Sequence, residues 1–221
     1  MVDILDEVEE DIRYERMLRM ARRYGAVAVM AAILVLIGVG AQEFWQAHKK
    51  RVADEYGTRY LALTQAVDQP GATISPQVAT DAATNLVKFA DSAPETYKIL
   101  AFMRAAALYA NMDETPKAAA LWTRVAADEA APRLIRDAAN LLWAEHELGT
   151  AKDADLLARL QPMVLAGNPY HGLARSLQAM VYLHEGNVAM AKSLFSQVQN
   201  DPSVTSGVRS RAAAMLTQLN G

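Results

Sequence analysis

An uncharged run near the N-terminus constrains the fold of this chain more than any other feature. Residues 24–42 contain no charged side chain and are densely apolar at their centre. As a helix rising by ~1.5 Å per residue, they cover roughly 28 Å, close to the hydrocarbon thickness of a bilayer. We therefore predict one transmembrane helix over residues 24–45, with Tyr24 at one interface and Phe44 and Trp45 at the other.

The basic residues around this run favour a cytoplasmic N-terminus, because positive charge is retained on the cytoplasmic side. The part of the chain after the run is then exported. A cleaved signal peptide is the alternative, since Val39, Gly40 and Ala41 form a small-residue pattern that a signal peptidase reads. Residues 1–23 are longer than a short basic leader, which favours a retained anchor. The flanking basic residues are Arg13, Arg16, Arg19, Arg22 and Arg23 before the run and Lys49, Lys50 and Arg51 after it.

Residues 1–23 are predicted to form a charged cytoplasmic helix. Ile4, Val8 and Ile12 recur at helical spacing, and acidic residues crowd the start of the segment while arginines crowd its end. This order of charges suits the helix dipole. We interpret the segment as a solvated helix that fixes the topology; a docking or degradation signal is the alternative.

The remainder of the chain is expected to be all-α. Hydrophobic residues make up 52% of the sequence, and their excess is mostly alanine, leucine and methionine, which are good helix formers. No useful stretch alternates with period two. We predict a helix over residues 49–67, a break at Pro70 and Gly71, and a second helix over about 77–91.

Four prolines then mark a repeat. Pro94, Pro132, Pro169 and Pro202 stand at separations of 38, 37 and 33 residues, each at the start of an apolar helical stretch. A period of this size is typical of stacked helical arrays. We predict a tetratricopeptide-like helical-repeat solenoid over residues 46–221, following the single transmembrane helix. Its expected parts are three units, 94–131, 132–168 and 169–201, and a capping helix, 203–219.

Two of these units carry the tetratricopeptide pattern of small residues and rings that lets two antiparallel helices pack closely. Both sets share one spacing, although the usual turn glycine is replaced by Asp113 in the first unit. In the last unit, Gly186 and Asn187 are expected to form a left-handed turn. The middle unit is degenerate. The predicted repeat-packing residues are Ala106, Tyr109, Ala118 and Trp122 in the first unit, and Ala179, Tyr182, Gly186, Ala191 and Phe195 in the last.

The order of these features resembles the family of YfgM-type ancillary subunits of the Sec translocon, which are tetratricopeptide-like proteins of the Gram-negative inner membrane. The resemblance covers nearly the whole chain. It implies a single-pass inner-membrane protein with a cytoplasmic N-terminus and a periplasmic repeat domain, associated with the protein-conducting channel and periplasmic chaperones. The residues that carry it are Arg22–Gly25, Phe44–Trp45, Tyr56, Tyr60, Tyr97, Leu134–Ala139 and Val208–Ala212.

Composition argues against several other functions. A net charge of -3 gives no bulk attraction to nucleic acid, whose binding would call for a basic stripe on the folded domain. The absence of cysteine excludes disulfides and thiolate zinc sites. The four histidines are dispersed, and no phosphate-binding loop or nucleophile elbow is present. We expect no enzyme activity, no catalytic residue, no metal, no cofactor and no small-molecule substrate.

The first helices of the two clear units are expected to present flexible apolar side chains to the concave side of the solenoid, where they would bind apolar protein segments. Packing between neighbouring helices is the simpler alternative. The predicted function is a membrane-anchored interaction module for protein export; an envelope scaffold for cell-wall or outer-membrane assembly is the alternative. A cytoplasmic stress regulator acting through the N-terminal helix is compatible with both. The predicted groove residues are Leu100, Met103, Leu173, Met180 and Leu183.

Overall fold

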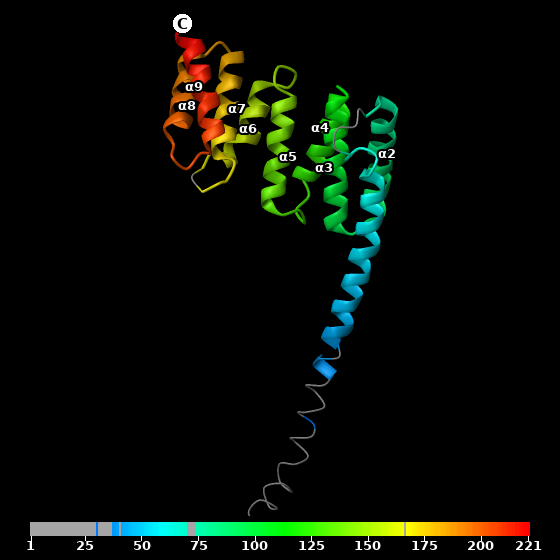
Figure 1. Ribbon diagram of the computed structural model, residues 1–221. Helices are drawn as coiled ribbons and strands as arrows, with labels where there is room; N and C mark the ends of the chain where they lie inside the picture. The colour runs from blue at the N-terminus through cyan, green and yellow to red at the C-terminus, as the bar shows by residue number, and fades with distance from the viewer. Residues whose placement is uncertain (1–29, 31–36, 40, 70–73, 166) are drawn as a thin grey trace, which may run out of the picture. The chain divides into compact units, whose positions relative to one another are not determined.

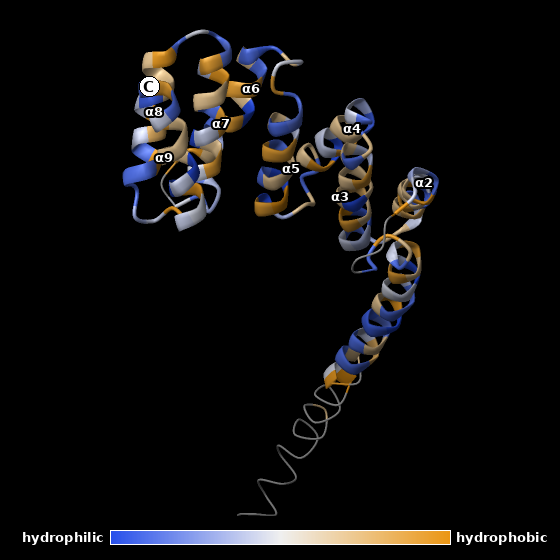
Figure 2. Cartoon of the chain, turned by 45° about the horizontal axis from the view of Figure 1, so that its top comes forward, coloured by the Kyte–Doolittle hydropathy of each residue, from blue (hydrophilic) through white to orange (hydrophobic). Residues whose placement is uncertain are grey.

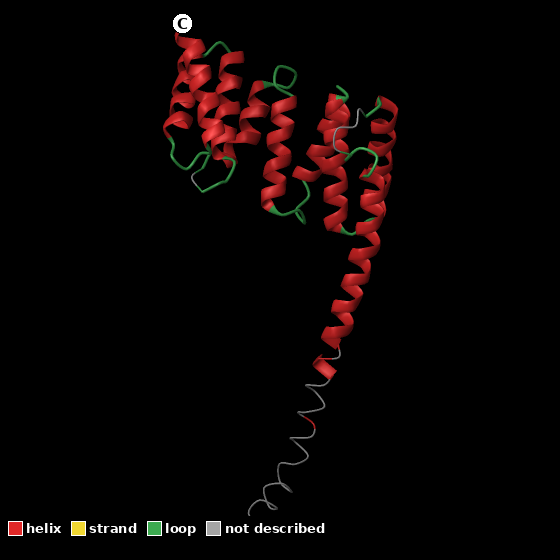
Figure 3. Ribbon diagram, in the orientation of Figure 1, coloured by secondary structure: helices red, strands yellow, loops and turns green. Residues whose placement is uncertain are grey.

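The structure is a computed structural model that describes residues 30, 37–39, 41–69, 74–165 and 167–221. Every regular element among these residues is a helix (Figure 3), as the predicted all-α class requires. The chain divides into two compact units, Met1–Glu55 and Tyr56–Gly221.

Most of the predicted N-terminal segments lie outside the described residues. This applies to the whole charged helix 1–23 and to the membrane helix 24–45 except for residues 30, 37–39 and 41–45, which are helical. In the first unit, residues 41–55 are helical, Phe44 and Trp45 are exposed, and Nζ of Lys49 lies 3.4 Å from the centroid of the Trp45 ring. Among the helices that are described, none combines the length and the apolarity needed to cross a bilayer.

The second unit is a succession of antiparallel helices (Figure 1). Each of the three sequence intervals 94–131, 132–168 and 169–201 holds one helical hairpin, and one further helix follows. The elements are residues 56–64, α2 (Pro76–Ser92), α3 (Glu95–Asn111), α4 (Thr115–Ala126), α5 (Arg133–His146), α6 (Asp153–Leu160), the 3₁₀ helix η1 (Gln161–Met163), α7 (His171–His184), α8 (Val188–Asn200) and α9 (Ser206–Asn220).

The hairpins stack through their second helices. Helix α4 packs against both α3 and α5, α6 packs against α5 and α7, and α8 packs against α7 and α9. Some first helices also meet directly, since α7 contacts both α5 and α9. Hydrophobic and hydrophilic residues alternate around these helices (Figure 2), so each one buries an apolar stripe against its neighbours.

Local sequence explains where the hairpins begin and turn. The side chains of Ser75 and Asn187 cap α2 and α8 by accepting hydrogen bonds from backbone N–H groups of the first turn. The left-handed turn expected at Gly186 is present, with φ of 79°. Asp113 occupies the equivalent turn of the first unit with φ of 59°, and Gly149 turns the middle unit with φ of 86°. Only a few residue types tolerate this conformation, so these positions mark the hairpin turns.

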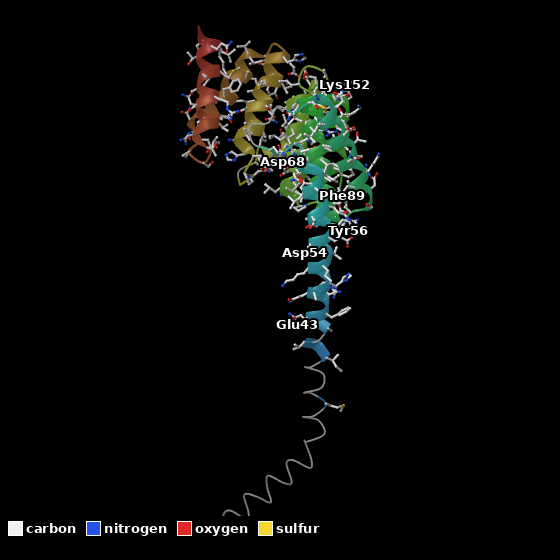
Figure 4. The ribbon with its side chains drawn as sticks, turned by 45° about the vertical axis from the view of Figure 1, so that its right-hand side comes forward. Glu43, Asp54, Tyr56, Asp68, Phe89 and Lys152 are labelled. Carbon is white, nitrogen blue, oxygen red and sulfur yellow. The ribbon has the colours of Figure 1, made fainter. Side chains whose placement is uncertain are left out.

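The core consists of three apolar clusters, which lie mainly around α2–α5, α5–α7 and α7–α9. Most of the predicted repeat-packing residues lie in the first and third clusters, and Tyr182 is half-buried against the third, whereas Gly186 is exposed in its turn. Tyr56 packs on Phe89 of α2 with ring centroids 5.9 Å apart (Figure 4). The buried members of the predicted set are Ala106, Tyr109, Ala118, Trp122, Ala179, Ala191 and Phe195.

The loop between α8 and α9 is held against the start of α7 by polar contacts of Asp201. Asp201 Oδ2 lies 3.2 Å from Nε2 of His171 and 3.3 Å from Nη1 of Arg175. Hydrogen bonds from the hydroxyl and the backbone N–H of Ser203 hold the pKa of Asp201 below its ordinary value of 3.8, and His171 lowers it further. These contacts place the apolar side chain of Val204 directly over α7.

Gly172 of α7 is the residue that permits this contact. A Cβ atom at Gly172 would lie 2.7 Å from both methyl carbons of Val204, which is only 6% exposed. We expect Gly172→Ala to lower the free energy of unfolding by about 1–3 kcal/mol, because the loop must move to relieve the overlap. Gly207→Ala is the control, since nothing lies within 4 Å of its Cβ position. Chemical denaturation of the full-length chain in detergent micelles measures both; equal stability of the two variants would refute the prediction.

The lowered pKa of Asp201 predicts a pH dependence. Because the folded state favours the carboxylate, its stabilising contribution is complete above the unfolded value near 3.8 and is lost as the pH falls below that value. We expect the difference in melting temperature between the wild type and Asp201→Asn to shrink as the pH is lowered from about 5 to about 2, roughly the range over which a carboxyl group with a lowered pKa takes up its proton. Circular dichroism of the full-length chain provides the measurement, with the exposed Asp81→Asn as the charge-matched control. Parallel pH profiles of wild type and Asp201→Asn would contradict the prediction.

Candidate functional site: two apolar grooves

The predicted groove residues lie on the first helices of two hairpins. Leu100 and Met103 belong to α3, and Leu173, Met180 and Leu183 belong to α7. Leu100 is 45% exposed and Met180 is 38% exposed, while the other three are half-buried.

Met180 and Leu173 contribute to a groove of about 380 Å³ between α5, α7 and α9, which we call the α7 groove. Its surface is mostly apolar. The lining residues are Leu141 and Glu145 of α5, Leu173, Ser176, Leu177 and Met180 of α7, Phe195 of α8, and Val208, Arg211, Ala212, Ala214 and Met215 of α9.

Leu100 and Met103 contribute to a separate groove of about 450 Å³ between α3 and the start of α5, which we call the α3 groove. The structure therefore divides the predicted residues between two sites. Leu183 lines neither groove and packs against the core cluster of α7–α9, which favours the packing interpretation for this residue. The residues around the α3 groove are Glu95, Thr96, Ile99, Leu100, Met103, Ala130, Pro132 and Ile135.

The charged residues at the two grooves differ in their partners. At the α3 groove, Glu95 pairs with Lys98, whose Nζ also lies 3.2 Å from a carboxylate oxygen of Asp128. Hydrogen bonds to Asp128 and Glu95 raise the pKa of Lys98, so its ammonium group stays charged and has its partners within the chain. At the α7 groove, Glu145 and Arg211 are exposed, and neither forms an ion pair with any described residue.

The wall that α9 contributes is the part of the site that sequence reasoning missed. The helix was expected only to cap the solenoid, yet it supplies Val208, Ala212 and Met215 to the α7 groove. Their spacing of i, i+4 and i+7 is the signal that indicates an apolar face. Such spacing does not reveal that the face is left partly open beside α7.

The grooves offer surface for binding and no evident reactive centre. Within the described part of the chain, no group of three or more histidine, aspartate or glutamate side chains is arranged to hold a metal ion. The α7 groove combines a flexible thioether at Met180 with leucine side chains and a half-buried Met215. Surfaces of this kind adapt to apolar segments of other proteins.

Comparison with known proteins agrees with this geometry. The sequence profile of the tetratricopeptide repeat-like domain matches residues 21–215. No curated protein and no solved structure matches the chain significantly. Because the profile covers most of the chain, and the structure shows stacked helical hairpins between residues 95 and 200 of the matched region, the chain belongs to the tetratricopeptide repeat-like domain family.

Proposed function

We propose that this protein is a membrane-anchored interaction module that serves protein export and catalyses nothing. Its repeat domain binds other proteins through apolar grooves, and its N-terminal helix holds the domain at the inner membrane with the N-terminus in the cytoplasm. The observation that carries the proposal is the α7 groove, where Met180 is exposed above an apolar lining, in a family whose domains commonly bind proteins.

The proposed partners are subunits of the Sec translocon and periplasmic chaperones or their exported clients. This assignment is supported by the resemblance of the N-terminal features and repeats to the YfgM-type ancillary subunits. An anchor would confine the grooves near a channel in the same membrane and so raise their effective concentration for it. Exposed Phe44 and Trp45, followed by Lys49, suit a helix that emerges from a lipid interface.

Crosslinking in intact membranes tests the interaction. We expect the full-length protein to crosslink to translocon subunits and periplasmic chaperones, and Met103→Glu together with Met180→Glu to reduce that yield about tenfold, because a carboxylate in an apolar contact loses its hydration. Met190→Glu is the matched control, since Met190 is 43% exposed on α8 and lines neither groove.

Circular dichroism first establishes that the double variant and the Met190→Glu control both fold. Unchanged crosslinking by the Met103→Glu/Met180→Glu protein would exclude the grooves as the binding surface. Capture of cell-wall enzymes or outer-membrane assembly factors in place of the channel and chaperones would refute the export assignment and favour an envelope scaffold.

The topology has its own test. A reporter enzyme that becomes active only after export is fused after Gly221, and we expect activity together with resistance of the full-length protein to carbonate extraction, since residues 24–42 carry no charge. A reporter active only in the cytosol, or release of the protein by carbonate, would contradict the anchor.

A further inference from the structure

The α7 groove has one charge on each wall. Glu145 lies on α5 and Arg211 lies on α9, and these are the two ionisable residues among its lining side chains. Helix α7 contacts both α5 and α9 and lies between them (Figures 1 and 2). The groove is therefore apolar, with one acidic residue on the α5 wall and one basic residue on the α9 wall.

Neither Glu145 nor Arg211 has an ion-pair partner within the described part of the chain. Other charged groups nearby are engaged, since Arg175 pairs with Asp201 and Arg209 donates a hydrogen bond to the carbonyl oxygen of Pro202. Glu145 and Arg211 are exposed and have no such partner among the described residues. A ligand that reaches both walls would find one unpaired acid and one unpaired base.

The shape of the groove favours a helical ligand over an extended one. An extended peptide gains its affinity by pairing its backbone with a free sheet edge, whereas this groove is walled by helices whose backbone groups are already bonded. A volume of about 380 Å³ suits a few apolar side chains from one face of a helix, spaced i, i+3 or i+4, and i+7.

We infer that the α7 groove binds one amphipathic helix of a partner protein, with a basic residue on the flank beside Glu145 and an acidic residue on the flank beside Arg211. The apolar stripe of that helix lies on Leu177 and Met180, and the two ion pairs fix its direction. This inference rests on the proposed function, and it adds the secondary structure, charge pattern and orientation of the bound segment.

The direction follows from geometry. A helix turned end to end with the same stripe against α7 exchanges its flanks, so its acidic residue would face Glu145 and its basic residue would face Arg211. Both contacts then become repulsive. The apolar contacts alone would accept either direction.

The test uses the full-length chain in detergent micelles and a designed helical peptide of roughly 18 residues, long enough to populate a helix. The peptide has zero net charge, a leucine stripe, lysines on one flank, glutamates on the other and a photocrosslinker at its N-terminus. Fluorescence anisotropy compares the wild type with Glu145→Lys, Arg211→Glu and the charge-exchanged double variant. The controls are Glu129→Lys and Lys152→Glu, which reverse exposed charges outside the groove (Lys152 is labelled in Figure 4).

Each single variant has two walls of the same sign, so we expect its affinity for the peptide to fall about fivefold. The double variant restores an attractive pair on each side once the peptide has turned round, so its affinity returns to within about twofold of wild type. Mass spectrometry then shows the crosslink moved from one end of α7 to the other. The control variants bind as the wild type does.

Several outcomes would overturn the inference. Equal affinity of the wild type and both single variants would show that Glu145 and Arg211 do not interact with the charges of the peptide. A further loss of affinity in the double variant would show that the peptide does not turn round to form the exchanged ion pairs. Absence of peptide binding to the wild type would exclude a helix site. Peptide affinity that weakens as the protein concentration rises, because protein molecules occupy one another's grooves, would assign the groove to a second copy. None of these results alters the membrane crosslinking test of the proposed function, so the two can fail separately.

Discussion

Close approach of helices at alanine is the constraint on which the rest of the structure depends. Ala83, Ala101, Ala139 and Ala179 are fully buried where helices of the second unit meet. A residue with no side chain beyond Cβ lets neighbouring helices come together, and the large side chains beside it, such as Trp122, fill the space between them. No hairpin buries its apolar face alone, so each one depends on the next in the stack.

This stacking also creates the candidate site. Second helices such as α4 and α8 are packed on two sides, whereas the first helices meet one another only in part. The surface left open on the first helices is apolar because it continues the apolar stripe with which these helices pack against their neighbours. Function is therefore proposed where the packing of the array is incomplete, at Leu100 and Met103 in one groove and at Met180 in the other.

The two grooves show how far sequence reasoning reached. Helical spacing and the shared order of small and aromatic residues indicated that α3 and α7 are first helices, and Met180 was predicted to face the concave side of the solenoid. The same spacing could not separate Met180, which lines a groove, from Leu183, which packs in the core. Both are apolar and three residues apart, and only the position of the neighbouring helices distinguishes them.

The sequence by itself determined the all-α class, the proline-marked repeat and the positions of the turns. Helix periodicity, proline geometry and the preference of a few residue types for the left-handed backbone conformation each depend only on residues close together in the chain. Tertiary structure alone decided that α9 forms a wall as well as a cap, that Gly172 admits Val204, and that Glu145 and Arg211 face one groove. These features join residues tens of positions apart. Their proximity depends on how far each helix is displaced along the next, and that displacement follows from side-chain packing that local patterns do not encode.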